Sequence, residues 1–247
     1  QNDDTELIVI NDASTDGTGE RVKSYGGRVR LINLRENCGC VSKTRNIGLS
    51  YASGSYITFL DADDWYEPGA VNKIIEYINI YKADILKFEY TLVFPNGVRQ
   101  TPMNGNGKTK LVEKEKFKKD VYPYFIKGIY LNSVWSSVFK KDVLCGVFFP
   151  EDFQTAEDAV FCAKAYTNAK NVLFIPERLY CYFQSGSGLT GSGLNIMKKY
   201  KYNLKLMCCH LSLLKSWGMD NIYWRIMTVL RPLRLTFDKL IRMKDEN

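Results

Sequence analysis

An apolar segment of the sequence ends in three aspartates within four positions, in the stretch YITFLDADDWYEP at residues 56–68. Carboxylates this close repel one another, and they are costly to place beside an apolar strand unless a positive charge accompanies them. The stretch itself contains no lysine or arginine. Hard oxygen ligands of this kind suit Mg²⁺ or Mn²⁺. We therefore expect a divalent cation here, which would in turn bind a diphosphate. The plainer alternative is that Asp61 to Asp64 merely cap the next helix; Asp64 could do this, but three aspartates are more than a cap requires.

Two more acidic segments occur at comparable places. The segment Asn11–Asp16 follows the apolar run ELIVI, and Glu157 and Asp158 open a later predicted helix. In an open α/β sheet, ligands bind at the carboxyl ends of the strands. An acidic start also suits the positive end of a helix dipole. We expect these segments to gather around one crevice.

Strand and helix patterns alternate in the first half of the chain. Short apolar runs predict strands at residues 6–10, 28–33 and 56–60, and amphipathic runs predict helices at 19–25, 43–53 and 67–81. Residues 84–94 predict a further strand, which the turn at 95–97 folds into a hairpin. This alternation indicates an α/β sheet with parallel strands.

The second half is less regular. It predicts a lysine-rich helix at 110–128, a helix at 156–169, short strands at 171–175 and 178–183, and two helices in the tail. We therefore divide the chain into an α/β domain at 1–192 and a helical extension at 193–247. Because a core strand occurs within the first ten residues, we also expect that a first strand–helix unit is missing from these 247 residues.

Composition and charge narrow the class of protein. The chain is 45% hydrophobic and 25% charged, and no apolar stretch is long enough for a spanning helix. From Leu194 onward, eleven basic and four acidic residues account for the whole net charge of +7. A neutral body argues against nucleic-acid binding, whereas the basic tail indicates an anionic partner. Ordinary packing of the tail and contact with an anionic membrane both remain open.

Several conspicuous residues have plain interpretations. The seven cysteines are scattered without a paired CxxC spacing, which indicates reduced thiols in a cytoplasmic protein. His210, the only histidine, is expected to pack within a helix. The glycine-rich segments 186–188 and 191–193 lack the lysine of a phosphate-binding loop. They are expected to form either a loop over the active site or a linker.

Several motifs occur in a familiar order. They are ELIVINDASTDGTGE (6–20), NCGCVSKTRNIGLSYASGSYITFLDADDWYEP (37–68), EDAVF (157–161) and RLYCYF (178–183). With these motifs the chain resembles the family 2 glycosyltransferases, which are inverting enzymes with the GT-A fold and include bacterial polysaccharide glycosyltransferases. The resemblance extends from the amino terminus to about Gly193. It implies a mixed, mostly parallel sheet flanked by helices, here with a helical extension at the carboxyl end.

The resemblance also implies a nucleotide-sugar donor, Mn²⁺ or Mg²⁺, and a saccharide or lipid-linked saccharide acceptor. Asp12 would hydrogen-bond the base, which we expect to be uracil, and Arg45 would lie near the donor phosphates. Asp61 would face the ribose and Asp63 would ligate the metal. Asp61 is the second candidate metal ligand, and Asp64 would lie close by.

On the acceptor side, the resemblance implies that Asp158 is the general base and that Glu157 supports it. Trp135 lies in a segment where relatives often have an aromatic residue near the acceptor. The sequence departs from the family pattern at Ala13, where a glycine is usual, and at Ser136 and Ser137, where relatives often have asparagine and lysine. The implied function is sugar transfer with inversion in surface polysaccharide synthesis.

Two other functions are open. A strand ending in Asp-x-Asp also resembles the nucleophile loop of haloacid-dehalogenase-type phosphatases, but Asp64 and Trp65 follow here instead of a small pair. A degenerate transferase that only binds a nucleotide or sugar is the second alternative.

Overall fold

The structure is a computed structural model that describes residues 4–102, 107–128, 130–185 and 196–245, with side chains of the last helix as far as Arg234. The first half contains β1 (Ile8–Asn11), α1 (Thr18–Lys23), β2 (Arg30–Asn33), α2 (Val41–Tyr51), β3 (Tyr56–Thr58), β4 (Trp65–Tyr66), α3 (Ala70–Tyr81), β5 (Ile85–Val93) and β6 (Arg99–Gln100). Strands and helices alternate here as predicted, except that the short strand β4 was not predicted. The predicted hairpin at 95–97 joins β5 to β6, and the amide of Gly97 donates to the carbonyl of Phe94.

The second half contains β7 (Lys110–Glu113), α4 (Phe117–Asp120), α5 (Tyr122–Lys127), β8 (Ser137–Lys140), α6 (Glu157–Asn168), β9 (Asn171–Phe183), α7 (Ile196–Leu213) and α8 (Ile222–Asp245). The single helix predicted at 110–128 is wrong at its start. Its first residues form β7, which pairs antiparallel with β9, and Pro123 lies in the first turn of the separate helix α5. Partners on β9 therefore override the local helical pattern.

The strands form a mixed α/β arrangement, but most pairings are antiparallel. β1 and β2 pair in parallel as a two-stranded sheet, and the larger sheet has the order β3-β8-β5-β9-β4, with β6 and β7 at its margins. Among the described strands of the larger sheet, only β5 and β9 pair in parallel. The expectation of a mostly parallel sheet is therefore corrected, because β4, β6, β7 and β8 each run against their neighbours. The expected preceding strand–helix unit stays a prediction.

Strand β9 replaces the two short strands predicted at 171–175 and 178–183. It runs beside β5, and the register slips between Lys87 and Tyr90 of β5, opposite Phe174 to Tyr180 of β9. Pro176, which has no amide hydrogen to donate, lies inside this bulge. The proline therefore interrupts the sequence pattern without ending the strand.

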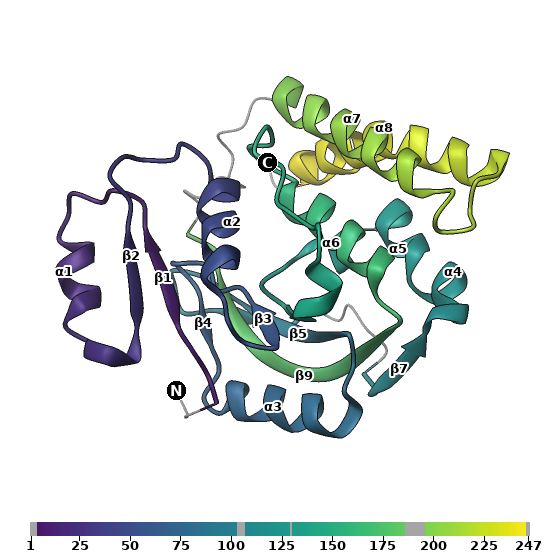
Figure 1. Cartoon of the computed structure of the whole chain (residues 1–247). Coiled ribbons are helices and arrows are strands. Elements are labelled where there is room, and N and C mark those ends of the chain that lie inside the picture. The colour runs from purple at the N-terminus through teal and green to yellow at the C-terminus, as the bar shows by residue number, and fades with distance from the viewer. Residues whose placement is uncertain (1–3, 103–106, 129, 186–195, 246–247) are drawn as a thin grey trace.

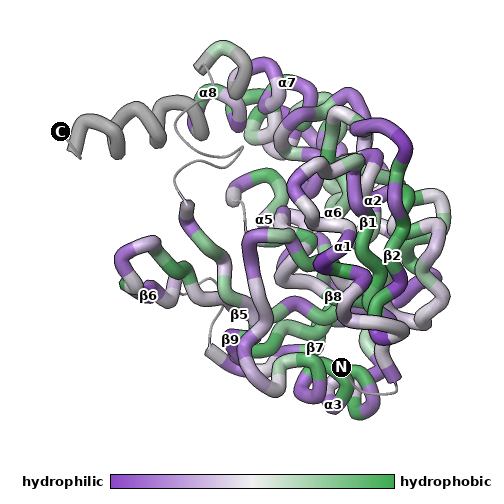
Figure 2. The backbone as a smooth tube through the Cα atoms, turned by 90° about the vertical axis from the view of Figure 1, so that its left-hand side faces the viewer, coloured by the Kyte–Doolittle hydropathy of each residue, from purple (hydrophilic) through white to green (hydrophobic). Residues whose placement is uncertain are grey.

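Helices cover both faces of the larger sheet (Figure 1). α3 covers one face, and α4, α5 and α6 cover the other, with α7 and α8 packed farther out. Each face has its own apolar core, and alternation along β5 sends Leu86 and Phe88 toward α3 and Ile85 toward α6. Apolar strands lie at the centre and polar segments toward the outside (Figure 2).

The tail forms the two predicted helices, and α8 continues through Pro232. His210 on α7 is fully buried against the rings of Phe125 and Trp217, as expected of a packed helix residue. Burial lowers the pKa of His210 to about 3, so the ring is neutral. The predicted boundary at 192 and the glycine-rich segments 186–188 and 191–193 lie outside the described residues.

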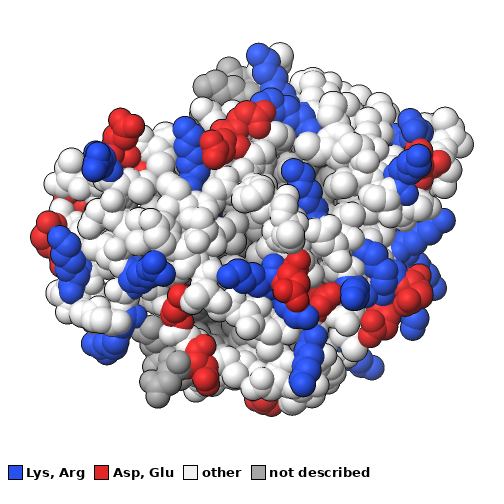
Figure 3. Space-filling view, viewed as in Figure 1, with Lys and Arg blue, Asp and Glu red and all other residues white. Residues whose placement is uncertain are grey.

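The surface bears on the expected partners. On the face in Figure 3, basic and acidic side chains are interspersed and no single sign dominates. The outer face of α8 exposes apolar side chains, namely Ile222, Tyr223, Ile226, Val229, Leu230 and Leu233. Among the described residues, no helix combines the length and hydropathy that a membrane span requires. Contact of the tail with an anionic membrane stays a prediction.

Candidate active site

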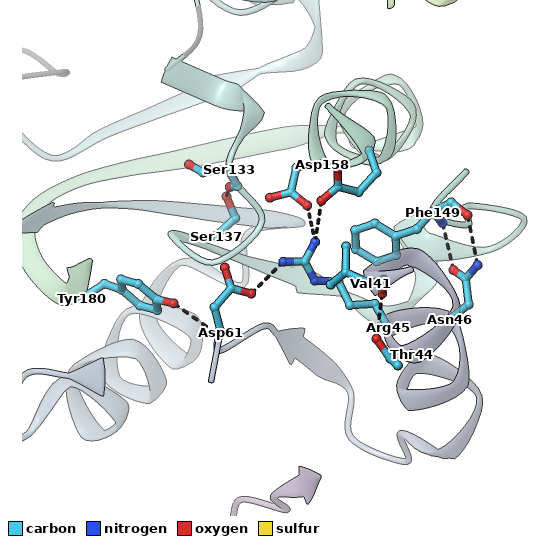
Figure 4. Close-up of polar contacts among 11 residues, drawn as sticks. Val41, Thr44, Arg45, Asn46, Asp61, Ser133, Ser137, Phe149, Asp158 and Tyr180 are labelled. Carbon is cyan, nitrogen blue, oxygen red and sulfur yellow. Dashed lines mark hydrogen bonds and ion pairs between the residues drawn. The ribbon is translucent and has the colours of Figure 1, made fainter. Parts of the chain in front are cut away.

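The guanidinium of Arg45 joins three carboxylates that are far apart in the sequence. Its Nη2 lies 2.6 Å from Asp61 Oδ1, and its Nη1 lies 2.5 Å from Asp158 Oδ1 and 3.1 Å from Glu157 Oε1. Arg45 comes from α2, Asp61 from the loop after β3, and the other two carboxylates from the first turn of α6 (Figure 4). The structure thus gathers four of the predicted site residues, and Arg45 supplies the positive charge that we expected from a metal alone.

Side-chain contacts hold α2 against the segment that leads into α6. Asn46 Nδ2 donates to the Phe149 carbonyl at 3.0 Å, and the Phe149 amide donates to Asn46 Oδ1 at 2.8 Å (Figure 4). The Phe149 ring stacks on Phe161 of α6 with centroids 4.0 Å apart, and the Arg45 guanidinium lies 5.3 Å from the centroid of the same Phe149 ring. These contacts fix Arg45 beside the start of α6.

Arg45, Asp61, Glu157 and Asp158 form a cluster, called the Arg45 cluster below. It is short of positive charge, because one guanidinium faces three carboxylates. Burial raises the pKa of Asp158 above the ordinary aspartate value, against the opposing effect of Arg45. The neighbouring Glu157 and Asp61 carboxylates raise it further. Such an environment favours binding a proton or another cation at Asp158 near neutral pH.

Asp64 anchors the acidic loop, residues 61–64, to β9 and does not cap a helix. Its Oδ1 accepts a hydrogen bond from the Phe183 amide at 2.7 Å, and its Oδ2 accepts one from the Tyr180 hydroxyl at 2.8 Å. The same hydroxyl accepts from the Asp61 amide at 3.2 Å (Figure 4). Helix α3 begins at Ala70 without a side-chain cap, so the capping alternative is wrong. Burial raises the pKa of Asp64 to about 6.

Tyr180 was missed as a site residue in the sequence, although the alternating aromatic residues of RLYCYF were a usable signal. Replacing Tyr180 with phenylalanine should leave Asp64 Oδ2 and the Asp61 amide without this partner. We expect the free energy of unfolding to fall by about 1–3 kcal/mol. Urea denaturation measures the change, and Tyr25→Phe at an exposed tyrosine is the control. Equal stability of the two variants would contradict the anchoring role.

Asp12 lies directly after β1, in the loop that leads to α1. Its Oδ1 accepts from the Cys38 amide at 2.7 Å, and Asn37 Nδ2 donates to its carbonyl at 3.2 Å. The next residue, Ala13, has a φ of 56°, which explains why a glycine is usual there. No described contact joins Asp12 to the Arg45 cluster, so its predicted role stays a prediction.

Asp63 is exposed, and within the described residues it forms no ion pair. No group of three or more His, Cys, Asp or Glu side chains in the described part of the chain is arranged to hold a metal ion. A metal at this edge would take the rest of its ligands from water or from a bound molecule.

Trp135 belongs to an aromatic cluster beside Tyr180. Its ring stacks on Tyr180 and Tyr182 with centroids 4.9 Å and 5.0 Å away, and meets Tyr90 edge-on at 4.8 Å. Trp135 is half-buried, so part of the ring faces outward. Its predicted place near the acceptor stays a prediction.

Comparisons with known proteins define the class and then the family. Solved structures of TarS from S. aureus share the fold: the TarS 1–349 complex with UDP-GlcNAc aligns with a TM-score of 0.69 at 22% identity, over 83% of this chain and 57% of that one. The GT-A fold is thereby confirmed. A model of the family described as "Glycosyl transferase family 2" matches residues 1–142. The chain belongs to that family.

Curated relatives extend the likeness beyond residue 142. "Poly(ribitol-phosphate) beta-N-acetylglucosaminyltransferase TarS" of Staphylococcus aureus is 29% identical over 188 residues, which is 74% of this chain and 30% of the relative. "Glycosyltransferase GlyA" of Streptococcus pneumoniae is 30% identical over 181 residues, covering 72% and 26%. "Uncharacterized glycosyltransferase EpsJ" of Bacillus subtilis is 26% identical over 190 residues, covering 76% and 55%. The chain thus spans between about a quarter and about half the length of these relatives.

Proposed function

We propose that the chain transfers a sugar from a UDP-sugar to a hydroxyl group of a saccharide or lipid-linked saccharide, with inversion, in the synthesis of a surface polysaccharide. One observation carries the proposal: Asp158 lies at the start of α6 in direct contact with Arg45, which also binds Asp61 of the acidic loop. Family membership supports this class over the phosphatase alternative. The relatives named for N-acetylglucosaminyl transfer support a UDP-sugar donor.

Asp158 would act as the general base. A base works best when its pKa lies near the operating pH, and burial raises the pKa of Asp158 toward that range. Arg45 holds one carboxylate oxygen at 2.5 Å and thereby orients the other. The Asp158 carboxylate would take the proton of the acceptor hydroxyl as the hydroxyl oxygen attacks the sugar from the face opposite the diphosphate. A single displacement of this kind inverts the anomeric centre.

The acidic loop fits a divalent cation that is shared with the donor. Asp63 is exposed, Asp61 is half-buried, and the cluster has an excess of negative charge. Mg²⁺ is commonly held by one or two carboxylates together with substrate phosphates, which suits a chain without a three-carboxylate metal set in its described part. We assign Asp63 and Asp61 as the residues that would hold the ion. A bound Mn²⁺ or Mg²⁺ would offset the charge that develops on the leaving diphosphate.

Removing the Asp63 carboxylate should weaken metal-dependent donor binding. For Asp63→Ala we expect UDP affinity in the presence of Mn²⁺ to fall at least tenfold, or about 1.4 kcal/mol, because a direct ligand is lost. Isothermal titration with Mn²⁺ and with EDTA measures the change. Asp142→Ala, at an exposed aspartate of the 3-10 turn after β8, is the matched control. Unchanged Mn²⁺-dependent affinity would remove Asp63 from the metal site.

Turnover separates this proposal from the binding-only alternative. A panel of UDP-sugars is incubated with the chain, Mn²⁺ and candidate acceptors, and the release of UDP is followed. We expect UDP release with at least one donor. Donor binding without any release, in the presence of acceptor, would favour the binding-only function.

A further inference from the structure

Lys87, in the middle of β5, is 1% exposed, and its ammonium lies among hydroxyl and carbonyl oxygens and 5.6 Å from the centroid of the Tyr130 ring. Its ammonium lies 2.5 Å from Ser136 Oγ, 2.8 Å from Ser133 Oγ and 3.1 Å from the Ser133 carbonyl. In the described part of the chain it forms no ion pair with a carboxylate. Burying an ammonium without a counter-charge is costly, so this lysine calls for a role beyond filling the core.

The partners of Lys87 belong to one segment before β8, residues 130–137, which ends with the first residue of that strand and is called the turn below. Ser133 and Ser136 also bond to each other at 2.7 Å, and Ser137 Oγ donates to the Ser133 carbonyl at 3.0 Å. The Phe88 amide donates to the Ser136 carbonyl, which ties the turn to β5 at the next residue. Lys87 is thus the centre of the contacts that fix the turn on the strand.

This turn reaches the Arg45 cluster. Its 3-10 segment, Tyr130–Asn132, packs against α6. The Val134 amide acts on the Asp158 carboxylate and opposes the rise of its pKa. Ser133 and Ser137 lie on the same side of the cluster in Figure 4. Asp158 is therefore approached from two sides, by Arg45 of α2 and by the Val134 amide.

We propose that Lys87 is a positioning residue for Asp158, because it holds the turn at 130–137 in the conformation that directs the Val134 amide to that carboxylate. The inference rests on the proposed role of Asp158 as the base. Lys87 itself touches no substrate, because Ser136 and Ser137 are fully buried and close it off from solvent.

The first test replaces Lys87 with methionine, which keeps the length of the side chain and removes its charge. We expect kcat to fall about 10²-fold, because the base is misplaced, while the Kd for the UDP-sugar is unchanged. Amide hydrogen exchange in residues 130–137 should become faster. Lys114→Met is the matched control, because the Lys114 ammonium is also partly buried and donates to a carbonyl, that of Thr167, away from the turn.

A second variant exploits the strand register. Lys87 and Ser137 are direct partners in the antiparallel pair β5–β8, so their side chains share one face of the sheet. The double variant Lys87→Ser with Ser137→Lys returns an ammonium to the same cluster from the opposite strand. We expect it to regain kcat and slow exchange relative to Lys87→Met. If Lys87→Met does not fold, the double variant still tests the positioning role of Lys87. A folded double variant without activity would then overturn the proposal.

The outcomes distinguish this inference from the proposed function. Wild-type kcat and unchanged exchange in Lys87→Met would overturn the inference while sugar transfer stands. If the wild-type chain transfers no sugar from any UDP-sugar, the proposed function fails, and hydrogen exchange alone then tests whether Lys87 holds the turn. Unchanged exchange in that case overturns the positioning role as well, whereas faster exchange supports it.

Discussion

Asp158→Asn is expected to lower the rate of sugar transfer by about 10²–10⁴-fold, the contribution typical of a general base. Asparagine has nearly the same shape, and its amide oxygen can still accept from Arg45, but it cannot take up a proton. The donor Kd should therefore be preserved. Steady-state kinetics and titration with UDP-sugar measure the two effects separately.

A pH profile gives this prediction a second test. The base must be ionised to act, and burial raises its pKa, so activity should fall as the pH drops through a value above that of an ordinary aspartate, about 3.9. Asp142→Asn, at an exposed aspartate, should keep both rate and profile. Full activity in Asp158→Asn would mean that another group accepts the proton.

Arg45→Met is expected to destabilise the fold and to abolish transfer. Among the described residues the guanidinium is the single cation bound to Asp61, Glu157 and Asp158, and its side chain is only 12% exposed. Removing one partner of a buried charge cluster costs about 3–5 kcal/mol, because the remaining charges are left uncompensated. Urea denaturation at neutral pH measures the loss. Arg45→Lys should recover only part of it, since a compact ammonium cannot serve three carboxylates as a planar guanidinium does.

The stability deficit of Arg45→Met should depend on pH. In the folded wild type the pKa of Asp158 is raised above its unfolded value, so this carboxyl contributes stability at low pH, which is lost as the pH rises through the folded pKa. Without Arg45 the pKa is raised further, and the loss on raising the pH is larger. The deficit should thus shrink between about pH 7.5 and about pH 5. An equal deficit at both values would assign it to lost packing, and Arg28→Met, at an exposed arginine, is the control.

Much of the fold and site could be predicted because the informative patterns are local. The alternation of short apolar runs and amphipathic segments predicts β1, α1, β2, α2, β3 and α3 but not the short strand β4, and the acidic segments after β3 and at the start of α6 indicate the site. Asp61, Glu157 and Asp158 were placed in one site on the family resemblance, and the structure brings them together around Arg45.

The remaining features depend on partners that are distant in the sequence. Residues 110–113 form a strand because β9 lies beside them, although their own pattern favours a helix. Tyr180 is 116 positions from Asp64, and Lys87 is 46 positions from Ser133, so neither contact leaves a local trace. A lysine in an apolar strand gives no sign of hydroxyl partners until the chain is folded.

The slip in β9 has a consequence for how this active site tolerates insertions and deletions. Four residues of β5, from Lys87 to Tyr90, are matched by seven residues of β9, from Phe174 to Tyr180, so β9 carries three extra residues. Because three is an odd number, the side chains that face α3 change from odd-numbered to even-numbered positions across the bulge. Leu173 and Ile175 face α3 before Pro176, and Tyr180 and Tyr182 face it after Pro176. Deleting one residue there would restore strict alternation and turn the Tyr180 hydroxyl away from Asp64. The length of this bulge thus sets the parity on which the acidic loop depends.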